Sequence, residues 1–241
     1  MNMPSFNLRA HPAELSTLLR GETETVSVWS KSWNTQRFLL HVTVTIVGTG
    51  FYGAAMGWWR DPQQALYVAI KFPLIILLTT LGNALLNGMF APLLGLNIPF
   101  RQSFSAIVMS FTIASAILGA FSPLIAFMVW NAPDLGAKNF SGSTYNFILL
   151  AHVSAIALAG VTGKVRLFQL LAQLGGGRAV AFRVQFAWLA GNLFLGSQLS
   201  WILRPFIGSP TLPVEFFRQA AFHGNFFEAV LHSLRQIFQF N

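Results

Sequence analysis

The fold is decided by the stretch Phe104–Trp130, which has the sequence FSAIVMSFTIASAILGAFSPLIAFMVW. It contains no charged residue, and a helix needs about 20 mostly apolar residues to cross a bilayer. The run is long enough to tilt or to kink at Pro123. Because lipid offers no hydrogen bonds to the backbone, a segment of this length predicts a transmembrane α-helix.

Four other apolar runs are similar in length and composition, and they lie at residues 38–59, 72–94, 145–161 and 186–203. A further run around 165–184 contains too many basic residues and three consecutive glycines, so we do not expect it to span. The sequence therefore predicts an all-α, polytopic integral membrane helix bundle. Residues 38–204 form the five-span domain, residues 1–37 a cytoplasmic segment and residues 205–241 an extramembrane C-terminal segment.

The composition favours a membrane protein and excludes several other classes. Of the 241 residues, 54% are hydrophobic and only 9% are charged, whereas about 25% are charged in a soluble domain. This excludes a soluble enzyme and a disordered chain, and the lack of cysteine excludes a disulfide-stapled one. The net charge of +8 comes from basic residues scattered singly, so we expect contacts with anionic lipid headgroups and no nucleic-acid binding.

The placement of the basic residues predicts the orientation, because Lys and Arg accumulate on the cytoplasmic side of a membrane. The side that holds the N-terminus has nine: Arg9, Arg20, Lys31, Arg37, Arg101, Lys164, Arg166, Arg178 and Arg183. The other side has six: Arg60, Lys71, Lys138, Arg204, Arg218 and Arg235. We therefore expect a cytoplasmic N-terminus and a C-terminus outside.

The connecting segments differ in character. Residues 13–19 predict a short helix, whereas residues 21–35 have the composition of a polar linker. Residues 164–174 place apolar residues at helical spacing among basic and amide side chains, which predicts a separate amphipathic helix at the membrane surface. Residues 63–70 are expected to lie at such an interface as well, ahead of the second span.

Residues 225–240 repeat the amphipathic pattern. We expect this helix to dock on a partner chain, with membrane-surface contact as the alternative. Pro210 and Pro213 predict a stiff spacer that holds the helix clear of the fifth span. The expected anchors to the partner are Phe227, Leu231, Leu234 and Phe238.

Small residues recur at four-residue spacing inside the spans, and such rows allow helix backbones to approach closely in lipid. We expect these rows to pack mainly within this bundle, with packing against another subunit as the alternative. They are Gly53 and Gly57 in the first span, Ser115 and Gly119 in the third, and Ala151, Ala155, Ala159 and Gly163 in the fourth.

Polar side chains inside the spans are the other candidates for function. For Asn83 and Asn87, we favour hydrogen bonds between helices, for example to Ser or Thr of the third span, over a polar path. A path through the second and fifth spans would also use Asn192 and Gln198.

Two histidines lie inside spans and suggest a cofactor, since imidazole ligates both haem and chlorophyll. The depths of His41 and His152 differ by roughly 15 Å. This makes a shared axial pair improbable and leaves a single pigment ligand open. We predict no other cofactor and no metal site.

The sequence contains none of the catalytic motifs considered. The carboxylates lie outside the predicted spans, and there is no HExxH or GxSxG motif. We therefore predict no catalytic residue and no enzymatic activity.

A family resemblance rests on Lys71-Phe72-Pro73-Leu74, then Leu77-Leu78-Thr79, Asn87, Leu94-Gly95 and Phe100-Arg101-Gln102-Ser103-Phe104. This run resembles the Lys-x-Pro-Leu, Leu-x-Thr, Gly and Phe-Arg-Gln core of bacterial membrane proteins related to the Yip (Ypt-interacting protein) superfamily. The resemblance covers about residues 65–205. It implies a five-span bundle in a bacterial inner membrane with a cytoplasmic N-terminus, and it brings no catalytic residues.

Eukaryotic members of that superfamily are membrane-traffic adaptors that contact small GTPases. This chain lacks the acidic, aromatic cytosolic segment that such a contact needs, so the resemblance implies an organising or accessory role. The leading hypothesis is a non-enzymatic scaffold or accessory subunit that packs against other membrane-protein chains. The alternatives are a channel or transporter, and a pigment- or haem-associated subunit.

Overall fold

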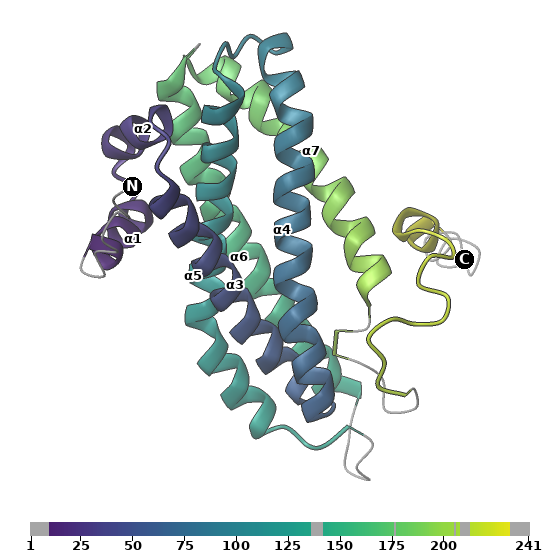
Figure 1. The fold of residues 1–241 in the computed structure, drawn as a ribbon. Coiled ribbons are helices and arrows are strands. Elements are labelled where there is room, and N and C mark those ends of the chain that lie inside the picture. Colours follow the sequence, from purple (N-terminus) through teal and green to yellow (C-terminus); the bar gives the residue numbers. More distant parts are fainter. Residues whose placement is uncertain (1–9, 136–141, 176, 205, 208–212, 232–241) are drawn as a thin grey trace, which may run out of the picture.

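The computed structural model describes residues 10–135, 142–175, 177–204, 206–207 and 213–231. These residues form helices and connecting turns, with no β-strand among them. The helices are α1 (Ala10–Arg20), α2 (Thr23–Lys31), α3 (Thr35–Trp58), α4 (Pro62–Leu93), α5 (Phe100–Trp130), α6 (Gly142–Leu174) and α7 (Gly177–Leu203) (Figure 1). A short helical segment follows at residues 226–231.

The five helices α3 to α7 are each long and apolar enough to cross a membrane. This confirms the predicted all-α, multi-pass membrane bundle. Within it, α3 packs against α4 and α5, α5 packs against α6, and α7 packs against α4 and α6. In Figure 1, α7 crosses α4 and leads away from the bundle toward the C-terminal segment.

Several helices are longer than the predicted spans. The 32 residues of α4 and the 33 of α6 extend over about 50 Å, whereas the apolar part of a bilayer is about 30 Å thick. Residues 164–174 are not a separate helix, because they form the last turns of α6, and residues 63–70 form the first turns of α4. The start signal of α4 is Asp61, whose carboxylate accepts a hydrogen bond from the Gln63 N–H at 2.7 Å.

The predicted polar linker at residues 21–35 is also wrong, because most of it forms α2. This helix is stabilised by contacts with α5 and α6, since a helix of nine residues is too short to be stable alone. Ser30 is buried, and its hydroxyl accepts a hydrogen bond from Nε2 of Gln102 in α5 at 3.2 Å. The turn before α2 needs Gly21, which has φ of +72° and lies against Arg166 of α6.

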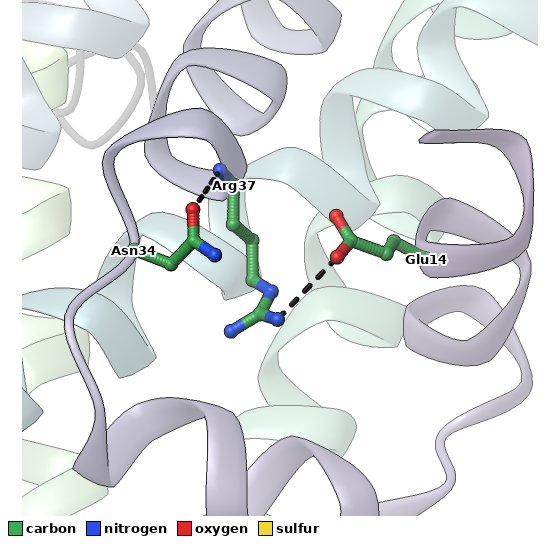
Figure 2. Close-up of polar contacts among 3 residues, drawn as sticks. All are labelled: Glu14, Asn34 and Arg37. Carbon is green, nitrogen blue, oxygen red and sulfur yellow. Dashed lines mark hydrogen bonds and ion pairs between the residues drawn. The ribbon is translucent and has the colours of Figure 1, made fainter. Parts of the chain in front are cut away.

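The N-terminal helices are attached to the bundle through Arg37 at the start of α3 (Figure 2). Its backbone N–H donates to Oδ1 of Asn34, the N-cap of α3, at 3.1 Å. Its guanidinium lies 3.3 Å from the carboxylate of Glu14 in α1 and stacks over the Trp29 ring of α2 at 4.4 Å. One side chain therefore connects α1, α2 and α3.

The buried apolar side chains form two clusters at different levels of the bundle. One joins α1 and α2 to α5, α6 and α7, and it includes Leu18, Val26 and Trp188. The other joins the C-terminal half of α3 to the first part of α6, and it includes Tyr52 and Ile148. The N-terminal helices thus belong to the first cluster, while the segment after α7 reaches the second through Ile207.

Candidate functional site

Three asparagines form a chain of amides that joins α4 to α7. Nδ2 of Asn87 donates to Oδ1 of Asn83 at 2.6 Å. Nδ2 of Asn83 in turn donates to Oδ1 of Asn192 on α7. Asn83 and Asn87 are buried completely or almost so, with 0% and 1% of their surface exposed. The two asparagines of α4 are thus paired inside the bundle.

The bond from Asn83 to Asn192 is a hydrogen bond between helices, whereas Asn87 bonds to Asn83 within α4. The partner of Asn83 is thus on α7, and neither asparagine bonds to Ser or Thr of the third span among the contacts described. The reason is the close approach of α7 at Gly191, where a Cβ atom would lie 3.0 Å from Oδ1 of Asn83. A side chain at this position would therefore need the Asn83 amide to move by a few tenths of an ångström.

Gln198 has a different role from the three asparagines. Its Oε1 accepts a hydrogen bond from the backbone N–H of Phe226 at 3.2 Å. One ring pair reinforces this contact, since Phe194 of α7 stacks on Phe227 with 5.4 Å between the ring centroids. Gln198 therefore attaches the C-terminal segment to α7.

The expectation that a proline spacer holds this segment clear of the fifth span is therefore wrong at residues 226–227. Of the four expected partner anchors, Phe227 packs on α7 of its own chain while 43% of its surface stays exposed. Leu231 is 50% exposed. Leu234, Phe238 and Pro210 lie outside the described residues.

The two candidate cofactor histidines are buried in different surroundings. Nδ1 of His152 lies 3.0 Å from the hydroxyl of Tyr52 on α3, and the two rings meet edge to face. His41 lies three turns earlier on α3, about 16 Å away along the helix axis. Neither ring nitrogen of His41, nor Nε2 of His152, has a hydrogen-bond partner among the described residues. The imidazoles do not converge on one site.

The small residues lie at close contacts between helices of this chain. A Cβ atom on Gly53 or Gly57 would lie 2.5 or 2.6 Å from a backbone oxygen of α4. On α6, Ala155 and Ala159 are buried and Ala151 is half-buried. The carbonyl of Gly163 accepts a hydrogen bond from Ser110 of α5 at 3.0 Å.

The tightest contact between helix backbones at a glycine involves Gly48, which the four-residue rows did not include. A Cβ atom on Gly48 of α3 would lie 2.2 Å from the backbone oxygen of Ser115, and one on Gly119 would lie 2.9 Å from Cα of Gly48. Ser115 and Gly119 therefore mark the point where α5 crosses α3. The sequence feature that could have indicated this close contact is the number of glycines in the first span, and not their four-residue spacing.

Lys71 is a buried charged residue whose surroundings the sequence did not indicate. Its side chain is 0% exposed, and it lies within the spanning helix α4, where a charged residue is unusual. Nζ donates to the backbone oxygen of Glu215 at 3.4 Å and lies 5.0 Å from the ring centroid of Phe216. Because the sequence placed Lys71 at the edge of the second span, it gave no sign that the segment after α7 covers it.

The polar groups inside the bundle thus act mainly as connections between helices: α4 to α7 through the asparagines, α3 to α6 through Tyr52 and His152, and α5 to α6 through Ser110. The resemblance to the Yip superfamily stays a prediction. Comparisons of this chain with protein-family models, with curated proteins and with solved structures gave no match.

Proposed function

We propose that this chain is a non-enzymatic scaffold or accessory subunit of a bacterial inner membrane, and that it packs against other membrane-protein chains through the outer face of α7. In this proposal the N-terminus lies in the cytoplasm and the C-terminus outside. Anionic headgroups then surround the basic residues at both surfaces.

The observation that carries the proposal is a ridge of large apolar side chains along α7. Phe182, Phe186, Leu189 and Leu193 follow one another at spacings of four, three and four residues, and they are 64%, 64%, 38% and 63% exposed. This is the spacing at which one helix packs its side chains between those of another. We call these four residues the α7 ridge.

The position of α7 supports the same conclusion. Its buried residues are Ala181, Val184, Trp188 and Leu203, and its other residues are half-buried or exposed. The C-terminal segment extends this surface, because Phe227 stacks on Phe194. A second transmembrane helix placed along the α7 ridge would bury several aromatic and aliphatic side chains at once.

The intramembrane amides argue for a structural role over transport. A polar path needs groups that face a water-filled route, whereas Asn83, Asn87 and Asn192 are hydrogen-bonded to one another. Hydrogen bonds of this kind stabilise the association of helices in lipid.

The test compares two double variants in the native membrane. In Phe186→Ala with Leu193→Ala, the α7 ridge is truncated. In the matched control, Phe147→Ala with Leu158→Ala, two side chains of α6 with exposures of 65% and 53% are truncated. After extraction into polymer nanodiscs, wild type and control should migrate with a second membrane protein, identified by mass spectrometry, and the ridge variant should migrate alone.

Three results would contradict the proposal. One is a wild-type chain that migrates alone, and another is a complex made only of copies of this chain. The third is a solute or ion flux through liposomes that contain the purified chain alone, since this would favour the channel or transporter.

A further inference from the structure

A cavity of about 380 Å³ lies between α6, α7 and the segment that follows α7. Its volume is in the range of about 300–1,000 Å³ that small-molecule sites occupy. Most of its wall is apolar and includes Met56 of α3, Phe72 of α4, and Leu149 and Ile156 of α6. Leu149 and Ile156 are 41% and 38% exposed on a spanning helix, so the cavity opens toward lipid.

The shape of the cavity follows α6. Both Tyr145 and Ile156 line it, and they are separated by about 16 Å along the helix axis. Ser200 contributes the wall on α7, and Phe206 lines the cavity beyond the end of that helix. An extended hydrocarbon chain lying parallel to α6 fits such a space, whereas a compact soluble ion would leave most of the apolar wall uncovered.

One end of the cavity is cationic. The guanidinium-bearing residue Arg218 lines it, and the charge of Arg218 also acts on Lys71 and Arg204. Burial, together with repulsion from Arg218, lowers the pKa of Arg204. Neither Arg204 nor Arg218 forms an ion pair with a carboxylate within the described part of the chain. Positive charges grouped in apolar surroundings are stabilised by a negative partner.

We propose that this cavity binds one molecule of anionic phospholipid, with its phosphate at Arg218 and an acyl chain along α6 between Tyr145 and Ile156. The proposal does not depend on the role of the α7 ridge. It commits to a lipid because the cationic end and the long apolar wall are continuous, and a phospholipid joins these two chemistries in one molecule.

The experiment is native mass spectrometry of the purified full chain, titrated separately with phosphatidylglycerol, with phosphatidylcholine and with inorganic phosphate. We expect one phosphatidylglycerol, which has a net negative charge, to bind at least about tenfold more tightly than phosphatidylcholine, whose phosphate charge is balanced by its own trimethylammonium group. Arg218→Gln should abolish this preference. Arg178→Gln should keep it, because Arg178 is exposed at the other end of α7.

A second pair of variants tests the acyl-chain part of the site. Ser200→Phe places a ring in the cavity and should weaken phosphatidylglycerol binding by at least about tenfold. Ser197→Phe makes the same change one turn earlier, where the residue does not line the cavity, and should leave binding unchanged. If Arg218→Gln fails to fold, this pair decides the question.

The proposal is wrong if Arg218→Gln and Arg178→Gln bind phosphatidylglycerol equally, or if phosphatidylcholine binds as tightly as phosphatidylglycerol. It is also wrong if inorganic phosphate alone displaces the bound lipid, since the site would then recognise a free anion. Equal binding by Ser200→Phe and Ser197→Phe would place the lipid elsewhere.

Discussion

At the scale of single residues, the bundle is marked by polar side chains that find partners on distant helices. Tyr52 and His152 are separated by 100 residues in sequence, yet they share a buried hydrogen bond. In a low-dielectric interior, a polar group that loses its partner destabilises the fold by more than the same group at the surface. Such pairs therefore fix which faces of the helices meet.

Removing the Tyr52 hydroxyl tests this. Tyr52→Phe keeps the ring and leaves Nδ1 of His152 without its partner, so we expect the free energy of unfolding to fall by about 0.5–2 kcal/mol. The matched control is Tyr67→Phe, which removes an exposed hydrogen bond from Gln63 and should change stability by less than about 0.5 kcal/mol. Chemical denaturation in one detergent measures both. If both variants lost the same free energy of unfolding, the buried hydrogen bond between Tyr52 and His152 would add no more stability than the exposed one.

At the scale of elements, the helices meet where glycine allows backbones to touch. The crossing of α3 and α5 at Gly48 is the closest example, because a carbonyl oxygen of α5 occupies the place of a Cβ atom. In lipid, where apolar side chains gain little by leaving the solvent, such close packing is a main source of helix association.

Gly48→Ala should therefore destabilise the bundle. The added methyl group would lie 2.2 Å from the backbone oxygen of Ser115, and overpacking of this kind costs about 1–3 kcal/mol. Gly160→Ala is the control, since apart from the neighbouring backbone of α6 no heavy atom of the described residues lies within 4 Å of its Cβ position. That change should be neutral or stabilise α6 by up to about 1 kcal/mol. Circular dichroism measures the thermal unfolding of both variants. If Gly48→Ala were as stable as Gly160→Ala, the packing argument would be wrong.

How far the sequence predicts these elements depends on the range of the interactions involved. The five spans could be predicted because hydropathy is local and lipid imposes a minimum length. The helix α2 could not, because its stability comes from contacts with α5 and α6. For the same reason, the sequence indicated that Asn83 bonds to another helix but did not identify Asn192, and it did not indicate that Asn87 bonds to Asn83 within α4. The covering of Lys71 by residues 215–216 depends on how the chain returns after α7.

At the scale of the whole molecule, five helices are long and apolar enough to cross a membrane, and an odd number of spans would place the two termini on opposite sides. We expect the bias of nine basic residues against six to set which side is cytoplasmic. The lengths of α4 and α6 do not define where the bilayer lies along them, because both helices are longer than its apolar part is thick.

Reporter fusions test this arrangement directly. A protein that fluoresces only in the cytoplasm should give signal when fused to the N-terminus and none when fused to the C-terminus. A phosphatase that is active only outside should give the reverse pattern. Cytoplasmic signal from both ends would mean an even number of spans, and the five-span topology would be wrong.

The bond between Asn83 and Asn192 can form only late in the synthesis of the chain. The two residues are 109 positions apart, and a ribosome adds about 5–20 residues per second. During synthesis, roughly 5–20 s therefore pass between the addition of Asn83 and the addition of Asn192. Throughout that interval Asn83 lacks the α7 amide to which it bonds in the finished bundle, so every intermediate without α7 carries a polar group in the membrane whose final partner does not yet exist.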